Sequence, residues 1–474
     1  MKINYSSPIR GGIVLFFLTV SQLNGQEPDL ADGWKAPDTT KTKQIYSINQ
    51  ELLSASPPKN YLLAAVETVG VNMLVWSYDR YIKHEAWANI SFQSFKNNLR
   101  HGFVWDSDGF ATNQFFHPYS GALSFTSGRA NGIGFWQSLI YSFSGSLMWE
   151  LAMENEYPSA NDIITTPSSG IVLGEISYRI SSLFLDESAV GLDRAWRELT
   201  AALLCPMHGF NRLLKGNTWK AGPKPNRGNY SPVFSFGVNG VFLNNRFTEK
   251  QRFNFWKLNL EYGDVLATAK SSKPFDYFTL NAGLSYSRTN SIIEIYGTGM
   301  LWGKNLSMSF DRWSLIGIFK NFDILYNETY KISASSIGSG VMISSPISEK
   351  TRLNNIVILS GIILGGVNSI DTAIKNERDY NIGHGANGKI ESTLSIINFG
   401  KFYFRFNGYW LHTFVGIVGD ELIGIMTVGS QLKIIGPVSL AIEYINYDRH
   451  GEYVDYPSVR KNNFALRTYL SYEF

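Results

Sequence analysis

Two different periods of apolar and polar residues divide the chain near position 230. From about Asn60 to Gly216, apolar residues recur at spacings of three and four, which indicates helices. From about Ser231 onward, apolar and polar residues alternate, which indicates strands. The sequence therefore predicts an α+β protein whose expected units are a flexible polar lead-in at 26–59, a helical domain at 60–230 and a strand domain at 231–474.

The alternation is clearest at the end of the chain. Leu466 and Leu470 fall on one face of the last strand, whereas Arg467 and Glu473 fall on the other. Successive side chains of a strand point to opposite faces, so this strand has an apolar side and a polar side. Twelve such runs are expected, near 233–243, 255–265, 274–287, 291–304, 313–325, 331–346, 352–367, 381–397, 401–413, 422–435, 438–448 and 462–474.

The number and spacing of these strands favour a transmembrane β-barrel. Single-chain barrels of the bacterial outer membrane have an even number of antiparallel strands, short periplasmic turns and longer external loops. Here the turns at 348–350, 398–400 and 436–437 are short, and those at 368–380 and 448–462 are long. A soluble β-sandwich or a lipocalin-like barrel is the alternative.

The two ends of the chain agree with export to the outer membrane. Residues 1–25 have a basic start and an apolar run at Ile13–Val20, which predicts a signal peptide cleaved near Gly25; a buried N-terminal helix is the alternative. The strand half resembles bacterial outer-membrane barrels, in which a C-terminal aromatic residue is part of the assembly signal. That resemblance implies that the last strand, which ends in Phe474, binds the barrel-assembly machinery.

The amino-acid composition limits the kinds of partner that the protein is expected to bind. Only 17% of the residues are charged, 14% are aromatic and the net charge is +3, so nothing indicates nucleic-acid binding. Outer-membrane lipid is the expected partner. The single cysteine, Cys205, excludes an internal disulfide framework and a cysteine-rich metal site.

Five helices are expected in the first half, at 60–82, 84–100, 132–155, 168–185 and 190–204. The one at 132–155 carries a row of residues at successive steps of four, which share one face of a helix: Ser138, Ser142, Ser146, Glu150 and Glu154. The small residues permit close helix packing. The two carboxylates need compensation, for which Arg129 and Arg179 are candidates.

Short polar motifs between positions 106 and 179 resemble an uncharacterised family of bacterial envelope proteins, the domain of unknown function 3943. The matching pieces are Asn113-Gln, His117-Pro-Tyr, Arg129-Ala-Asn-Gly, Trp149-Glu, Ser159-Ala-Asn-Asp and Gly174-Glu. The resemblance covers roughly 110 residues. It implies an envelope protein and carries no activity.

The same stretch supplies the candidate site residues. The candidate catalytic residues are His117, Glu150, Glu154 and Asp162. The candidate binding residues are Asp106, Asp108, Asn113, Arg129, Asn131, Glu175 and Arg179. Structural roles compete with these assignments, because Asp106 and Asp108 suit a turn, Ser159 and Asp162 have capping-box spacing, and Glu175 with Arg179 forms a favourable i,i+4 pair.

No metal ligand set and no cofactor are predicted. A calcium loop that starts at Asp106 fails, because Phe110, Ala111 and His117 occupy positions that need an oxygen ligand, a glycine and a glutamate. A divalent metal held by His117 with Glu150 or Glu154 is possible, but no histidine-rich spacing supports it.

Three functional classes follow, in this order. The first is a structural or gated envelope barrel, in which the helical domain plugs or caps the periplasmic mouth. The second is a membrane-embedded enzyme that acts on lipid or lipopolysaccharide through His117 and nearby carboxylates. The third is a transporter for a small or amphipathic solute. A plug predicts that the polar cluster pairs with strand residues such as Lys389, Arg405 or Arg467, whereas an enzyme predicts that His117 and the acids converge in a pocket that opens toward lipid.

Overall fold

The computed structural model describes residues 58–223, 230–242, 250–265, 273–288, 290–308, 312–327, 329–369 and 379–473. The predicted signal peptide, most of the predicted lead-in and Phe474 lie outside these residues. The second half is a closed antiparallel barrel in which each strand pairs with its neighbours in sequence and β1 pairs with β12. The predicted twelve-stranded barrel is therefore confirmed.

The strands have the following bounds: β1 (Tyr230–Phe242), β2 (Lys250–Tyr262), β3 (Phe278–Tyr286), β4 (Ser291–Met308), β5 (Trp313–Tyr326), β6 (Lys331–Ser348), β7 (Thr351–Asn368), β8 (Tyr380–Ile396), β9 (Gly400–Val415), β10 (Gly419–Ile435), β11 (Val438–Tyr453) and β12 (Val459–Glu473). The turns after β6, β8 and β10 are short, as expected. The connection after β11 is shorter than expected, because β11 continues to Tyr453.

The two faces of each strand differ as the alternation predicts. In β12, Leu470 is 52% exposed on the outside, while Arg467 is 1% exposed inside the barrel. In β9, Phe402 and Phe404 point outward, while Tyr403 lines the interior. An apolar outer surface over a polar interior is the architecture of an outer-membrane barrel.

The helical half contains these elements: α3 (Tyr61–Tyr78), α4 (Phe92–His101), α5 (His117–Ala130), α6 (Phe135–Met148), α7 (Ala160–Phe184), α8 (Gly191–Leu204) and α9 (Pro206–Leu214). Single π-helical turns follow or precede three of them: η1 (Asp79–Lys83), η2 (Thr112–Phe116) and η3 (Trp149–Met153). None of the helices in the described part of the chain is long and apolar enough to cross a membrane.

Several helix boundaries differ from the prediction for local reasons. The helix expected at 84–100 begins only at Phe92, because His84 has a φ of 57° and the side chain of Ser91 starts a capping box. The helix expected at 168–185 begins eight residues earlier, at Ala160, since Ser159 caps it and Pro167 is accommodated inside it. The apolar spacing in the sequence does not predict α5 or α9.

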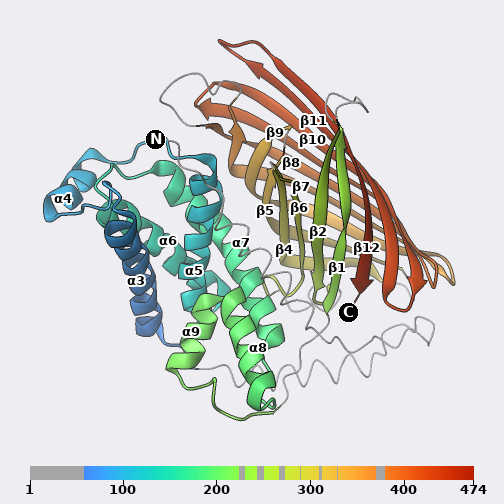
Figure 1. Ribbon diagram of the computed structural model, residues 1–474, viewed down its shortest axis with the longest axis horizontal. Helices are drawn as coiled ribbons and strands as arrows, with labels where there is room; N and C mark the ends of the chain where they lie inside the picture. The colour runs from blue at the N-terminus through green and yellow to red at the C-terminus, as the bar shows by residue number, and fades with distance from the viewer. Residues whose placement is uncertain are drawn as a thin grey trace.

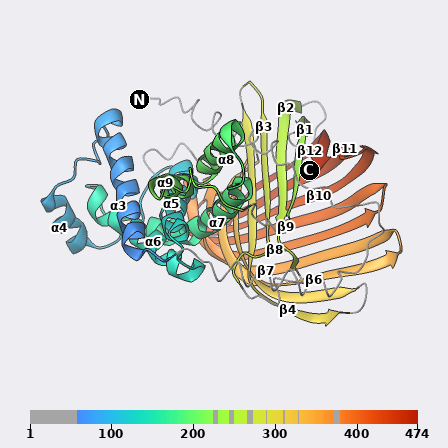
Figure 2. The ribbon, with the colours of Figure 1, turned by 90° about the horizontal axis from the view of Figure 1, so that it is seen from below.

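The helical half lies beside the barrel, and α7 runs along the outer wall at β4 and β5 (Figures 1 and 2). At Gly297 of β4, a Cβ atom would lie only 3.1 Å from Val172 and 3.2 Å from Ile176 of α7. The neighbouring residues Glu294 and Tyr296 line the interior, so Gly297 faces outward. The expectation that the helices plug or cap the mouth is not confirmed, because the described helix α7 packs on the outside of the wall.

Part of the barrel's apolar outer surface is therefore covered by protein. Phe278, Leu280 and Leu284 of β3 share one face, as predicted, but each is at most 7% exposed. They belong to the same buried cluster as Val172 and Ile176 of α7. Because lipid tails are as apolar as these side chains, close packing stabilises the contact rather than the removal of apolar area from water.

Polar contacts fix α7 and its surroundings at both ends of the wall. Near the short-turn end, Arg179 donates to Asp276 at 3.0 Å and to the backbone oxygen of Pro274 at 3.0 Å. Near the opposite end, the backbone N–H of Phe110 donates to Asp379 at 2.8 Å. The helical unit therefore extends along the height of the barrel.

The interior of the barrel is closed by its own side chains. Toward the end that carries Asp379, a buried apolar cluster includes Val241, Leu325, Leu411 and Ala465. Next to it lies an ion-pair layer, in which Arg467 binds Glu294 at 2.7 Å. Buried charges need such partners.

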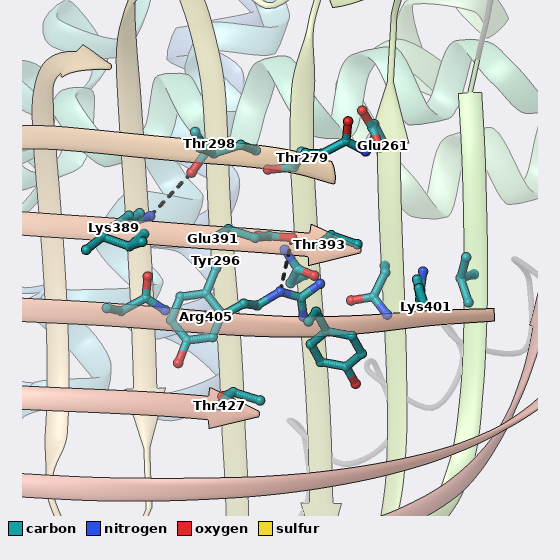
Figure 3. Close-up of a pocket in the computed structure, with 18 of the residues that line it drawn as sticks. Glu261, Thr279, Tyr296, Thr298, Lys389, Glu391, Thr393, Lys401, Arg405 and Thr427 are labelled. Carbon is teal, nitrogen blue, oxygen red and sulfur yellow. Dashed lines mark hydrogen bonds and ion pairs between the residues drawn. The ribbon is translucent and has the colours of Figure 1, made fainter. Parts of the chain in front are cut away.

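Beyond that layer, toward the short turns, lies a cavity of about 450 Å³. Figure 3 shows part of its lining, with Lys389 bound to Thr298 and Arg405 beside Glu391. Lys389 also pairs with Asp323 at 2.7 Å.

Candidate functional site

A histidine and two carboxylates converge where three helical segments meet. His117 begins α5, Glu150 lies in η3 and Asp162 lies in the first turn of α7. One donor atom from each of these three side chains lies within 4.8 Å of the others. Glu150 and Asp162 are each 1% exposed, whereas the side chain of His117 is 17% exposed, so the histidine marks the open side of the cluster.

Two π-helical turns place these residues. The turn η2 ends immediately before His117, and η3 contains Glu150. A π turn adds a residue to the helical repeat and re-aims the side chains that follow it, and such turns are frequent at functional sites. The row of serines along α6 packs as predicted: Ser142 donates to the backbone oxygen of Gly121, and Ser146 donates to that of Asp162.

Hydrogen bonds hold the carboxylates in place. The Oδ1 atom of Asp106 accepts from Asn113 at 2.7 Å and from Asn161 at 3.1 Å. The Glu150 carboxylate accepts from the backbone N–H of Ser159 at 2.7 Å. The Ser159 hydroxyl accepts from the backbone N–H of Asp162, so the predicted helix cap is present and also positions the cluster.

The electrostatics of the cluster are unusual. Burial raises the pKa of Glu150 to about 7, partly offset by the hydrogen bond from Ser159. Burial lowers the pKa of His117 to about 4, against the attraction of Asp106. Burial and the neighbouring Asp106 raise the pKa of Asp162. Near neutral pH the imidazole is therefore uncharged, and Glu150 can both take and give a proton.

The remaining candidate acids line the open side. Burial raises the pKa of Asp108 to about 6, and the negative charge of Asp106 adds to that shift. Burial and the charge of Glu150 raise the pKa of Glu154. In the described part of the chain, no Lys or Arg forms an ion pair with Glu150 or Asp162. The cluster therefore has an excess of acid and lacks a basic counterion at these two residues.

Exposed aromatic residues lie next to the site residues in the chain. Trp105 precedes Asp106 and packs edge-on against Phe414 of β9, with ring centroids 5.2 Å apart. Phe116 precedes His117, and its side chain is exposed. The site therefore lies near the end of the barrel opposite the short turns, where Trp105 contacts β9.

The other predicted binding residues lie elsewhere. Arg129 and Arg179, the expected counterions of Glu150 and Glu154, instead both bind Glu175, with N–O distances of 2.7 Å. These pairings replace the expected ones. Arg179 binds Glu175 because the two residues lie one helical turn apart on α7. Asn131 donates to the buried Glu67 at 2.7 Å, in a separate polar contact.

Two residues that were not among the predicted site residues also contribute to the site. Asn161 binds Asp106, and the Tyr380 hydroxyl at the start of β8 accepts from Asn113 at 2.8 Å. Asn161 stood inside a quoted motif, so its position beside Asp162 was a usable signal. Tyr380 is 267 residues from Asn113, and no local pattern connects them.

Comparisons with solved structures find distant likenesses only. The monoaromatic hydrocarbon channel CymD is 8% identical, with a TM-score of 0.23, over 52% of this chain and 88% of that one. The outer-membrane channel DcaP of Acinetobacter baumannii is 10% identical, with a TM-score of 0.23, over 54% and 100%. The toluene transporter TodX of Pseudomonas putida is 10% identical, with a TM-score of 0.23, over 52% and 90%.

Sequence comparison gives one further result. No curated protein matches the chain. A family model matches residues 102–207, a segment that contains His117, Glu150 and Asp162. The resemblance expected from the motifs is confirmed, and this segment of the helical half matches the domain of unknown function DUF3943.

Proposed function

We propose that the protein is a membrane-embedded enzyme that hydrolyses a bond in the headgroup region of a lipid or lipopolysaccharide. The observation that carries this proposal is the convergence of His117, Glu150 and Asp162 in the helical half, beside the end of the barrel where the exposed Trp105 contacts β9. Aromatic residues at the rim of a membrane barrel lie at the level of lipid headgroups. A lipid beside the barrel would therefore present its headgroup to the cluster.

The exposed surface of the helical half supports a lipid substrate. Large apolar side chains point outward from four helices, among them Leu62 and Leu74 of α3, Ile140 of α6, Leu199 of α8 and Leu213 of α9. Exposed apolar patches of this kind mark contacts with membranes or partners. They extend the apolar band of the barrel, so one lipid environment would surround both halves.

The proposed chemistry uses the proton affinities of the site. Water attacks the phosphorus or carbonyl carbon of a headgroup ester, and the bond from that atom to the leaving oxygen breaks. Asp108 takes a proton from the water and returns it to the leaving oxygen, and its pKa of about 6 suits both steps near neutral pH. The plug alternative predicted that the cluster would pair with Lys389, Arg405 or Arg467, but these three bind Asp323, Glu391 and Glu294 inside the barrel.

The test compares two site variants with a matched control. Cells that express His117→Ala or Glu150→Gln should show a changed envelope lipid profile by mass spectrometry, while pore conductance and heat-shifted mobility of the purified protein stay normal. Glu156→Gln, a change in an exposed glutamate two residues from Glu154, is the control and should match wild type. Normal lipids in both folded site variants would reject the enzyme.

We also propose the route to the membrane. A signal peptide at 1–25 is cleaved, and the strand that ends in Phe474 engages the barrel-assembly machinery. The purified outer-membrane protein should then begin near Gln26 by N-terminal sequencing. Recovery in the soluble periplasm would reject this route.

A gated or structural barrel is the second candidate, and the closed lumen favours it. In this form the gate is the ion-pair layer, in which Glu443 binds Lys257 at 3.1 Å and accepts from Tyr403 at 2.8 Å. Glu443→Gln should then raise conductance while His117→Ala leaves it unchanged. A transporter for a small or amphipathic solute ranks third, and the cavity of about 450 Å³ on the short-turn side would be its binding site.

A further inference from the structure

We propose that His117, Glu150 and Asp162 bind one divalent transition-metal ion, with Zn²⁺ as the probe. This inference rests on the proposed function, because it supplies the cofactor of that site. The three residues come from α5, η3 and α7, so a bound ion would join the three segments that build the cluster.

The three donor atoms lie close enough together for side-chain adjustments to bring them onto one ion. Nε2 of His117 lies 3.9 Å from Oδ2 of Asp162, and all three donor atoms lie within 4.8 Å of one another. Tetrahedral zinc bonds of 2.0–2.1 Å hold neighbouring ligand atoms about 3.3 Å apart. The His117–Asp162 pair therefore needs to close by only roughly half an ångström to bind an ion.

An unpartnered atom inside the cluster independently indicates a missing ligand. Oδ1 of the buried Asp162 accepts no hydrogen bond from an N–H or hydroxyl group of the described residues, and the carboxyl group of Asp162 lies against that of Asp106. A buried carboxylate oxygen without a partner is costly. A metal ion bound to this carboxylate would satisfy it.

Surrounding groups hold the ligands as a metal site requires. Ser159 donates its backbone N–H to Glu150 at 2.7 Å, and the capping contact between Ser159 and Asp162 fixes the start of α7. Such outer contacts orient metal ligands and affect affinity by 10–100-fold. Asp106, held by Asn113 and Asn161, adds negative charge beside the three ligands.

The donor set selects the class of metal. Imidazole nitrogen favours Zn²⁺, Fe²⁺ and similar ions, whereas Ca²⁺ and Mg²⁺ prefer oxygen alone. Three protein ligands leave a fourth position open for water or substrate, as in catalytic zinc sites. A bound cation would also offset the negative charge of the cluster, which would otherwise repel the phosphate of an anionic headgroup.

The experiment measures metal binding directly, without activity. The full-length mature protein is purified in detergent, stripped with EDTA and titrated with Zn²⁺, and its metal content is determined by atomic emission. One Zn²⁺ per chain is expected. Asp162→Asn, His117→Ala and Glu150→Gln should each weaken binding by at least about 100-fold, while Glu156→Gln binds as wild type.

Several results would overturn the metal site. These are no stoichiometric Zn²⁺, unchanged affinity in two folded ligand variants, or Ca²⁺ binding as tightly as Zn²⁺. Heat-shifted mobility checks folding of each variant, and His117→Ala, at the open side, is the least disruptive. If the protein binds zinc but the site variants leave the envelope lipids unchanged, the metal site stands and the enzyme is rejected. If the site variants change the lipids but the protein binds no zinc, the enzyme stands and the metal site is rejected.

Discussion

The imidazole of His117 and the carboxylate of Asp162 face each other across the starts of two helices, with Nε2 and Oδ2 3.9 Å apart. Neither residue belongs to a recognisable catalytic motif, and 45 positions separate them in the chain. Their approach depends on the tight packing of α5 on α7. At Gly170, a Cβ atom would lie 2.6 Å from the backbone carbon of Gly121.

That close contact gives a prediction for Gly170→Ala. The new methyl group would meet backbone atoms of α5, which cannot move aside as a side chain would, so we expect a loss of about 1–3 kcal/mol. Gly70→Ala on α3 is the matched control, because nothing lies within 4 Å of its Cβ position. It should stabilise the helix by about 0.5–1 kcal/mol. Denaturant titration followed by helical circular dichroism measures both changes.

Arg129→Ala should destabilise the helical half. It removes one of the two guanidinium groups that bind the fully buried carboxylate of Glu175. Loss of a partner from a buried pair costs about 3–5 kcal/mol, and we expect the lower end because Arg179 remains. Arg197→Ala breaks the exposed pair with Asp193 and should cost less than about 1 kcal/mol. Equal losses in the two variants would contradict the assignment.

Two adjacent positions of β10 test the register of the barrel. Val428 is 46% exposed on the outer face, whereas Thr427 lines the internal cavity (Figure 3). An arginine on the lipid face near mid-bilayer costs about 2–4 kcal/mol. When both variants are refolded in lipid vesicles, Val428→Arg should therefore unfold at a clearly lower denaturant concentration than Thr427→Arg. The reverse order would mean that the faces are exchanged.

Acid should weaken the helical half through His208. Burial lowers the pKa of this imidazole from 6.5 to about 3, and the positive charges of Arg212, Arg129 and Lys215 add to the shift. The unfolded chain then binds the proton more readily, so stability contributed by the neutral ring is full above pH 6.5 and falls as the pH drops toward 3. The slope approaches about 1.4 kcal/mol per pH unit.

Buried acids such as Glu67, whose pKa is raised by burial, make the fold more stable as the pH falls and so oppose the effect of His208. The variant His208→Gln separates the contribution of the histidine from theirs. The difference in unfolding free energy between wild type and variant should shrink between pH 6.5 and pH 4. A difference that stays constant over this range would show that the ring does not titrate as described.

The barrel could be predicted because alternation in a strand is a local property. Leu470 and Arg467 differ in polarity and stand on opposite faces, so the sequence alone assigns them to the outside and the inside. What covers the outer face could not be predicted. Phe278 and Leu280 are as apolar as Leu470, yet they contact α7, because an apolar side chain suits helix and lipid equally well.

The sequence predicted which residues form the site better than it predicted how they are arranged. The motifs selected His117, Glu150 and Asp162, which the structure brings together. The same reasoning assigned Arg129 to Glu150 or Glu154, although its partner is Glu175, 46 residues away. Several acids were equally plausible partners, and only the crossing of α5 and α7 decides among them. The π turns that aim His117 and Glu150 have no sequence pattern that we could have used.

The helix-covered wall bears on how the barrel meets the membrane. The outer faces of β8 to β12 carry exposed apolar side chains, whereas those of β3 to β5 are covered by α7. On the covered side the barrel therefore contacts its own chain in place of lipid, so the ring of lipid around it is interrupted over these strands.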